Sequence, residues 1–321
     1  MKMTSSYLAK ILFLFWLGFI VVSCHENGNS IVEKTQFEIE EAKINFGKKL
    51  FFDRQLSNDN SISCSDCHRP NYAFADTVAF SRGVSGHHSR RNSSTLLNIA
   101  NSPVFMFDGH IKTLEMQAIV PIQDSNEMGS RMSRLIQRLG SIKEYQQISK
   151  TIYKRKFDAF VLTRALASYQ KSLVSEGSRF DAFYNGDSTA LSYEEADGWR
   201  LFSEILNCTS CHPAPNFTTY KTENNGVYKD GDSDMGRFKI NNDSSEIGFF
   251  KVPTLRNIAL TSPYMHNGSI TNLSGILEHY LEIDHVHPNT SKLLKKKSLS
   301  EQEKENITIF LEALTDTLFV Y

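Results

Sequence analysis

The chain has 321 residues, of which 40% are hydrophobic and 22% are charged, and both values are ordinary for a globular protein. The length predicts about two domains, and the composition argues against disorder, collagen or a polytopic membrane protein. The 35 Lys and Arg residues balance 36 Asp and Glu residues, which gives a net charge of −1. No nucleic-acid partner is therefore expected, because such binding normally requires a basic excess.

Residues 1–23 are predicted to be a secretory signal. The apolar run at 11–22 follows a short basic region and is too short to span a membrane as a helix. It ends at Ser23 and Cys24, which resembles a bacterial lipobox in which the cysteine becomes lipidated; the alternative is a simple soluble signal. Residues 24–36 are polar and are predicted to be a tether. We therefore expect a periplasmic protein with a lipid anchor to a membrane.

The other four cysteines fall in two identical CxxCH motifs. The motif residues are Cys64, Cys67 and His68, and Cys208, Cys211 and His212. Two thiols one helical turn apart can bond to the two vinyl groups of a haem, and the adjacent His then binds the iron. We therefore predict two covalently bound c-type haems.

Three alternatives to haem fit these motifs less well. A shared zinc site usually separates its CxxC pairs by about 12–20 residues, whereas here more than 140 lie between them. Thioredoxin-like sites would need a surrounding βαβ pattern, which neither motif has. Disulfides within a CxxC pair would be strained.

An internal repeat surrounds the two motifs. The phrase Glu-Glu-Ala, Gly and Leu-Phe occurs within 40–51 and again within 194–202. Downstream, 95–100 matches 254–259, and Leu114 matches Leu273 at the same offset. A match of this length indicates two copies of one module.

Helical periodicity dominates the rest of the chain, and no sustained strand alternation occurs. The predicted fold is therefore mainly α, with two tandem cytochrome c-like haem domains related by the repeat. The N-terminal haem domain is expected at 37–185. The C-terminal haem domain is expected at 186–321.

The two copies differ where a sixth iron ligand would stand. Tyr280 lies on the apolar stripe of a predicted helix, and the matching offset in the first copy is Pro121, which cannot bind iron. Tyr280 would thus close the second haem while the first stays open to peroxide. The alternatives are an ordinary core tyrosine and ligation by His279, which lies further from the centre of the stripe.

Two polar residues lie close to Pro121 in the sequence. Glu127 could take a proton from one peroxide oxygen and deliver it to the leaving oxygen, and Gln117 could orient the substrate. Taken alone, both would read as surface residues on a helix and its following loop.

Further segments carry a family resemblance. They are 50–53, Arg91, Asn92, 96–98, Gln117, Pro121, 127–129, 253–257, 263–268 and 310–316. With the two haem motifs, these segments resemble the bacterial di-haem cytochrome c peroxidase and MauG family over nearly the whole mature chain.

The resemblance implies a role for each candidate residue. His68 would be the proximal ligand of the first haem, with Gln117 and Glu127 on its distal side. His212 would be the proximal ligand of the second haem, which relays electrons. Its sixth ligand is Met in the peroxidases and Tyr in the MauG branch, so Tyr280 is MauG-like.

The resemblance also implies one calcium ion between the haems. Its ligands here would be the Asn92 side chain and the carbonyl groups of Thr261 and Pro263, and oxygen ligands of this kind suit calcium. The family usually has Trp between the haems, where this chain has Phe107. Phe is much harder to oxidise, which places electron hopping through this residue in doubt.

A distal histidine of the peroxidases is replaced here by Val84. His87 and His88 lie three and four residues further on. Either could close the first haem, although exposed loop histidines are the favoured interpretation.

The predicted function is reduction of hydrogen peroxide to water with electrons from a small cytochrome c or copper protein. One alternative is a MauG-like enzyme that uses peroxide to oxidise a partner protein, which Tyr280 favours. An alternative of another class is a di-haem electron carrier, which ligation by His87 or His88 would favour. The family resemblance also admits a homodimer, although the sequence shows no interface for one.

Overall fold

Helices form most of the regular structure of the computed structural model, which describes residues 35–283 and 287–317. The first half contains α1 (Gln36–Phe51), α2 (Cys64–Cys67), α3 (Leu114–Gln117), α4 (Ile119–Gln123), α5 (Met132–Gly140), α6 (Lys143–Tyr153) and α7 (Ala159–Lys171). The second half contains α8 (Arg179–Tyr184), α9 (Tyr193–Arg200), α10 (Phe238–Asn241), α11 (Leu273–Leu281) and α12 (Glu301–Glu312). Strands β1 (Thr222–Glu223) and β2 (Phe250–Lys251) pair antiparallel. The mainly α prediction is confirmed.

The start of the described chain is the helix α1. The predicted signal at 1–23 and almost all of the predicted tether at 24–36 lie outside the described residues. Among the described helices, none has the length and apolar character that crossing a membrane requires.

Apolar side chains gather in two large clusters within the compact unit that runs from Gln36 to Tyr321. One cluster draws its buried residues from Phe46 to Leu173, and the other draws them from Phe180 to Leu314. Each cluster lies beside one CxxCH motif, because Cys64 packs against the first and Cys208 against the second. Each motif thus has its own hydrophobic surroundings.

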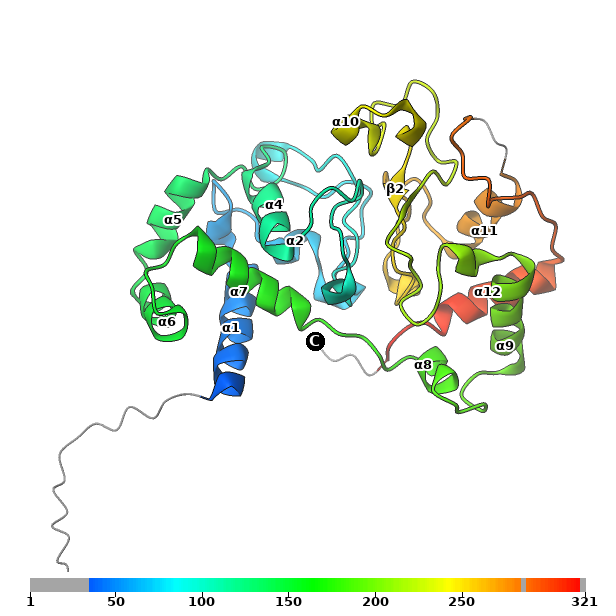
Figure 1. Ribbon diagram of the computed structural model, residues 1–321, viewed down its shortest axis with the longest axis horizontal. Helices are drawn as coiled ribbons and strands as arrows, with labels where there is room; N and C mark the ends of the chain where they lie inside the picture. Colours follow the sequence, from blue (N-terminus) through cyan, green and yellow to red (C-terminus); the bar gives the residue numbers. More distant parts are fainter. Residues whose placement is uncertain (1–34, 284–286, 318–321) are drawn as a thin grey trace, which may run out of the picture. The chain divides into compact units, whose positions relative to one another are not determined.

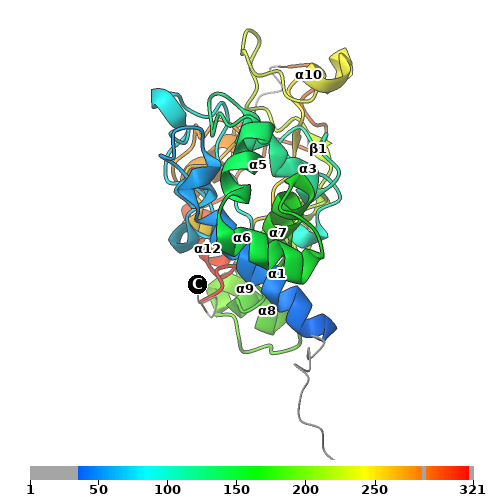
Figure 2. The same ribbon diagram turned by 90° about the vertical axis from the view of Figure 1, so that its left-hand side faces the viewer.

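A glycine allows the main helix pair of each cluster to cross closely. Helix α1 packs on α7 and α9 packs on α12 (Figure 1), and Figure 2 shows the first pair from a second direction. A Cβ atom on Gly47 would lie 1.9 Å from the Ala165 backbone oxygen, and one on Gly198 would lie 2.1 Å from the Asn306 backbone oxygen. Both distances are far inside van der Waals contact. The glycine in each copy of the repeated phrase therefore permits the helix crossing.

Equivalent asparagines of the two copies, Asn98 and Asn257, both form hydrogen bonds to Ser175. Asn98 and Asn257 both adopt left-handed backbone conformations, with φ of 55° and 57°. Their N–H groups donate to the carbonyl groups of Leu173 and Leu314, respectively. Their side-chain amides both reach Ser175, one at its carbonyl oxygen (2.9 Å) and the other at its hydroxyl (2.8 Å). Ser175 thus anchors equivalent turns of both copies.

Substituting the crossing glycines tests this packing. We expect Gly47→Ala and Gly198→Ala each to lower the free energy of unfolding by about 2–4 kcal/mol, because a backbone oxygen must move to admit the methyl group. Urea unfolding followed by circular dichroism measures the change. Gly140→Ala is the matched control, since a Cβ atom there would have its nearest neighbour at 3.9 Å. Equal stability of all three variants would contradict the proposed role of the glycines.

Candidate haem sites

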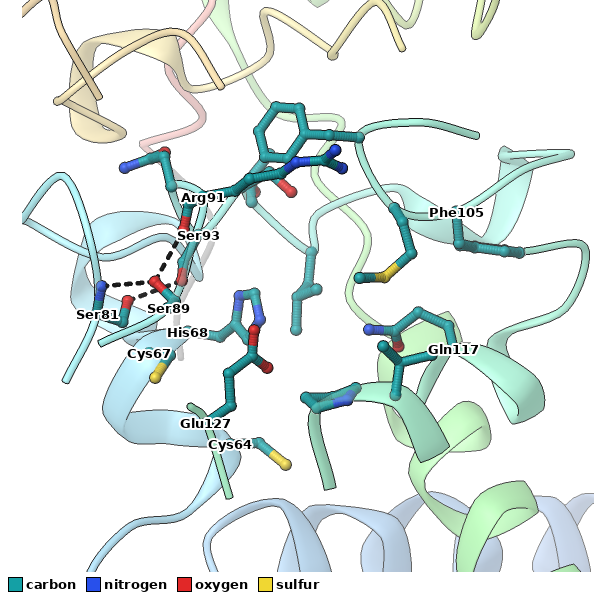
Figure 3. A pocket seen from close by; sticks show the side chains of 18 of the residues that line it. Cys64, Cys67, His68, Ser81, Ser89, Arg91, Ser93, Phe105, Gln117 and Glu127 are labelled. Carbon is teal, nitrogen blue, oxygen red and sulfur yellow. Dashed lines mark hydrogen bonds between the residues drawn. The ribbon is translucent and has the colours of Figure 1, made fainter. Parts of the chain in front are cut away.

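The first CxxCH motif forms one wall of a cavity of about 730 Å³. Helix α2 begins where the Ser63 N–H donates to the Asp66 carboxylate (2.8 Å), and its single turn places Cys64 and Cys67 on the cavity. His68 follows, and its Nδ1 donates to the Phe74 carbonyl oxygen (3.0 Å). Figure 3 shows the two thiols and the imidazole around the same space. Since Nδ1 carries the proton, the His68 Nε2 has a lone pair for a metal.

The second motif forms a wall of a separate cavity of about 250 Å³. Cys208, Cys211 and His212 line it, and the His212 Nδ1 donates to the Phe217 carbonyl oxygen at 2.9 Å. The two imidazoles are therefore oriented in the same way by a backbone carbonyl a few residues downstream. In both motifs the ring nitrogen left free is Nε2.

Burial sets the protonation of these groups. It raises the pKa of Cys64, Cys67 and Cys208 to about 12, so these thiols are protonated at neutral pH. It lowers the pKa of His68, and it lowers that of His212 to about 4. Both imidazoles are therefore neutral, which is the form that binds iron. Two thiols and one neutral imidazole on each cavity fit a covalently attached haem.

The described part of the chain offers no competing metal cluster. No group of three or more His, Cys, Asp or Glu side chains that could hold a metal ion occurs within 35–283 and 287–317. The two CxxC pairs lie on different cavities and so do not converge on one zinc ion.

Glu127 and Gln117 both line the first cavity. Figure 3 shows them approaching it from different elements, Gln117 from the end of α3 and Glu127 from the loop after α4. The backbone of Glu127 is fixed on both sides, because its N–H donates to the Asp124 carbonyl (3.1 Å) and its carbonyl accepts from the Val84 N–H (2.8 Å). The structure thus brings the two predicted distal residues onto one cavity with Pro121.

Burial raises the pKa of Glu127 to about 7. The nearby Asp124 carboxylate raises it further, and Arg90 opposes the shift. A carboxyl group with a pKa near neutrality can both accept and return a proton at neutral pH. Neither Asp124 nor Arg90 was singled out from the sequence, because their effect depends on proximity in space.

His87 and His88 do not reach the first cavity. Both side chains are exposed, and neither lines the cavity. The Nδ1 of His88 lies 3.3 Å from the Phe80 carbonyl oxygen. Val84 is buried and holds the Glu127 carbonyl, so this loop supports the distal side through its backbone.

Tyr280 lines the second cavity together with His212. Burial raises the pKa of its phenol to about 12, and a hydrogen bond from Asn225 opposes the shift. The rival ligand His279 is directed elsewhere, because its Nε2 lies 2.9 Å from the Asn225 carbonyl oxygen and it does not line the cavity. Of the two candidate ligands, Tyr280 therefore lines the cavity with His212, whereas His279 does not.

The residues predicted to bind calcium line one cavity. Asn92, Thr261 and Pro263 line the second cavity, and the Asn92 N–H donates to the His266 carbonyl (2.8 Å). The Asn92 amide nitrogen donates to the Val78 carbonyl (3.2 Å), which leaves its side-chain oxygen to accept or to bind a cation. Amide and carbonyl oxygens suit calcium, so these residues fit that ion.

The comparisons with known proteins agree with this geometry. A family model described as "Di-haem cytochrome c peroxidase" matches residues 41–189. The chain is 31% identical over 274 residues to the methylamine utilization protein MauG of Methylorubrum extorquens, covering 85% of this chain and 78% of that protein. It is 33% identical over 288 residues to cytochrome c551 peroxidase of Pseudomonas aeruginosa, covering 86% and 80%. The chain belongs to the di-haem cytochrome c peroxidase family.

Solved structures extend the likeness to the fold. The crystal structure of a MauG-like protein associated with microbial copper homeostasis superposes with a TM-score of 0.80 at 28% identity, covering 86% of this chain and 90% of that chain. The diheme peroxidase BthA of Burkholderia thailandensis matches with a TM-score of 0.75 at 23% identity, covering 86% of each chain. The chain is thus an oxidoreductase of this family, which implies two c-type haems, a peroxide substrate and an electron donor.

Several residues of this di-haem peroxidase line both cavities. Phe107 does so, in agreement with the position between the haems that the family resemblance implies for it. Lys251 in β2 does so too, and its N–H donates to the Phe107 carbonyl. The sequence analysis did not single out Lys251. The internal repeat could have indicated Lys251. The offset that pairs Thr95 with Thr254 also pairs Lys251 with Asn92, a predicted calcium ligand.

Replacing Glu127 should change how stability depends on pH. Its pKa of about 7 in the folded protein exceeds the unfolded value of about 4.3. The stability contributed by the protonated carboxyl is therefore present below about pH 4 and is lost as pH rises through 7. A glutamine side chain does not titrate, so we expect Glu127→Gln to avoid this loss. Between pH 5 and pH 8, its free energy of unfolding should rise by about 1–3 kcal/mol relative to that of wild type.

Urea unfolding of the haem-loaded protein at the two pH values measures this difference. Glu305→Gln, at an exposed position on α12, is the control and should follow wild type at both pH values. Parallel behaviour of Glu127→Gln and wild type would show that the carboxyl is not buried as described.

Proposed function

We propose that this protein is a di-haem c-type peroxidase that reduces hydrogen peroxide to water with electrons from a small cytochrome c or copper protein. The observation that carries the proposal is Glu127, a half-buried carboxyl with a pKa of about 7 on the cavity that Cys64, Cys67 and His68 also line. Peroxide reduction consumes two electrons and two protons and yields two water molecules. A proton-holding group beside the site of O–O cleavage is what this reaction needs.

A haem held by Cys64, Cys67 and His68 would supply the iron and the redox chemistry for peroxide cleavage. The Glu127 carboxylate takes the proton from one peroxide oxygen and returns it to the other, which leaves as water. Gln117 orients the peroxide through its amide, which can donate and accept hydrogen bonds. His68, held by the Phe74 carbonyl, is the proximal ligand of the first haem.

In the second site we propose His212 and Tyr280 as the axial ligands. Both side chains line the cavity, and the His212 Nε2 is free because Nδ1 is engaged by Phe217. If both side chains held the iron of a haem, that site would serve to receive and pass on electrons. We also propose one calcium ion at Asn92, Thr261 and Pro263.

We further propose that the two haem sites belong to tandem cytochrome c-like domains, 37–185 and 186–321. The shared backbone conformations of Asn98 and Asn257 and the paired helix crossings support this division. Helix α8 falls within the first of these ranges, but its Phe180 packs in the second cluster, so the packing changes from one core to the other before residue 186. The proposed compartment is the periplasm, with a lipid anchor at Cys24 after removal of the signal.

A MauG-like oxidase of a partner protein is the second candidate, and Tyr280 is the observation that favours it. A solved structure similar to this chain is also described as MauG-like. Peroxide consumption that proceeds with a small electron donor alone supports the peroxidase, whereas consumption that requires a protein to be oxidised supports this candidate. The electron carrier would need His87 or His88 at the first haem, and neither lines its cavity.

Replacing Glu127 tests the peroxidase directly. We expect Glu127→Gln to lower kcat for peroxide at least 100-fold, because general acid–base catalysis contributes about 10²–10⁴ in rate. Steady-state assays with a reduced cytochrome c measure turnover, and the visible spectrum confirms that both haems are present. Glu305→Gln is the control and should be fully active. Unchanged turnover in Glu127→Gln would rule out the proton-transfer role, and no turnover in wild type would favour the electron carrier.

Replacing Tyr280 tests the second site. We expect Tyr280→Phe to alter the visible spectrum of one ferric haem, because the phenol oxygen would no longer bind its iron. Tyr264→Phe is the matched control, since Tyr264 lines the same cavity but donates its hydroxyl to the Ile258 carbonyl (2.9 Å). A Tyr280→Phe spectrum identical to wild type would mean that Tyr280 is a core residue.

A further inference from the structure

Lys251 occupies an unusual place for a lysine. It lies at the end of the two-residue strand β2, paired with Thr222, and it lines both haem cavities. Its backbone is fixed, because its N–H donates to the carbonyl of Phe107, which also lines both cavities. The side chain therefore projects from a rigid point in the wall that the two cavities share.

Among the hydrogen bonds and ion pairs of the described residues, none involves the ammonium group of Lys251. Burial alone lowers the pKa of Lys251 to about 8, with no carboxylate opposing the shift. A cation held in such surroundings costs free energy unless an anion joins it. The position therefore requires a partner that the polypeptide does not supply.

The neighbouring cations differ from Lys251 in this respect. Arg91 also lines the first cavity, but its guanidinium binds Asp234 through Nε and Asp108 through Nη1. Arg82 and Arg90 line the same cavity with exposed side chains. Lys295 and Lys297 line only the second cavity and are also exposed. Lys251 is half-buried and unpaired, and it faces both cavities.

The internal repeat relates Lys251 to a residue of the first copy that is also proposed to bind a charged group. Lys251 is the counterpart of Asn92, at the offset that relates Thr95 to Thr254. Asn92 also lines both cavities and is the proposed side-chain ligand of calcium. Equivalent positions of the two copies would thus each provide positive charge, one through a bound ion and the other through a covalent ammonium group.

Haem brings the missing anions. Each haem carries two propionate carboxylates, on the edge of the ring opposite the vinyl groups to which the cysteines bond. Four carboxylates enter the protein with two haems, and buried carboxylates require paired cations. We propose that Lys251 is the cation in the shared wall that binds haem propionate and raises the reduction potential of the haem it pairs with.

The direction of the effect follows from charge. Ferric haem carries one more positive charge than ferrous haem, so a nearby cation disfavours the ferric form and raises the potential. Because Lys251 is directed toward both cavities, it can also adjust the driving force for electron transfer between the haems. The inference rests on the two proposed haem sites and does not depend on peroxide turnover.

Spectroelectrochemical titration of the purified di-haem protein tests the proposal. We expect Lys251→Met to lower the midpoint potential of at least one haem, and Lys251→Arg to remain close to wild type. Lys221→Met is the matched control, because Lys221 lies next to the same sheet, is exposed and lines neither cavity. Its charge is screened by solvent, so its replacement should shift the potentials less.

The outcome is decided after the haem content of each variant has been checked by the pyridine haemochrome spectrum. With two haems bound, potentials of Lys251→Met equal to wild type, or a shift no larger than that of Lys221→Met, would overturn the proposal. If Lys251→Met does not retain its haems, Lys251→Gln and Lys251→Arg provide the same comparison of neutral and charged side chains. Wild-type protein with fewer than two haems would instead overturn the haem sites.

Discussion

The candidate sites depend on one repeated hydrogen bond, from the Nδ1 of a histidine to a backbone carbonyl a few residues downstream. In the first site the carbonyl belongs to Phe74 and in the second to Phe217, and both phenylalanines have positive φ, at 57° and 50°. This left-handed turn brings the chain back beneath the imidazole. The bond fixes the tautomer, the ring plane and the free Nε2 together, so that a CxxCH sequence becomes a site able to present an axial ligand.

The two halves of the chain also share their backbone features near that bond, whereas the side chains around each cavity differ. A glycine lets one helix cross another at Gly47 and at Gly198, and a left-handed asparagine ties each copy to Ser175. These elements are required by backbone sterics and by the need to satisfy buried polar groups, which tolerate little variation. The side chains that face the cavities are under no such requirement. Chemical differences between the copies are therefore concentrated there.

Features that depend on the spacing of residues along the chain could be predicted from the sequence. The CxxCH motifs, the helical class and the offset that relates Thr95 to Thr254 can all be read directly. The near-neutral pKa of Glu127 could not, because it arises from burial and from Asp124 and Arg90 in space. Lys251 was missed because a lysine normally reads as a surface residue, even between apolar neighbours such as Phe250 and Val252. Among the Lys and Arg residues that the structure describes, Lys251 alone lines both cavities.

The differences between the copies form a consistent set. The first cavity presents Gln117 and Glu127, whereas the second presents Tyr280. Between them stand Phe107, which resists oxidation, and Lys251, which carries charge. A side chain that is hard to oxidise cannot readily hold an intermediate charge, so transfer between the sites would depend on their separation and on their relative potentials. A fixed cation in the common wall acts on those potentials. In this chain the wall would therefore control electron flow through electrostatics, where an oxidisable residue would control it through hopping.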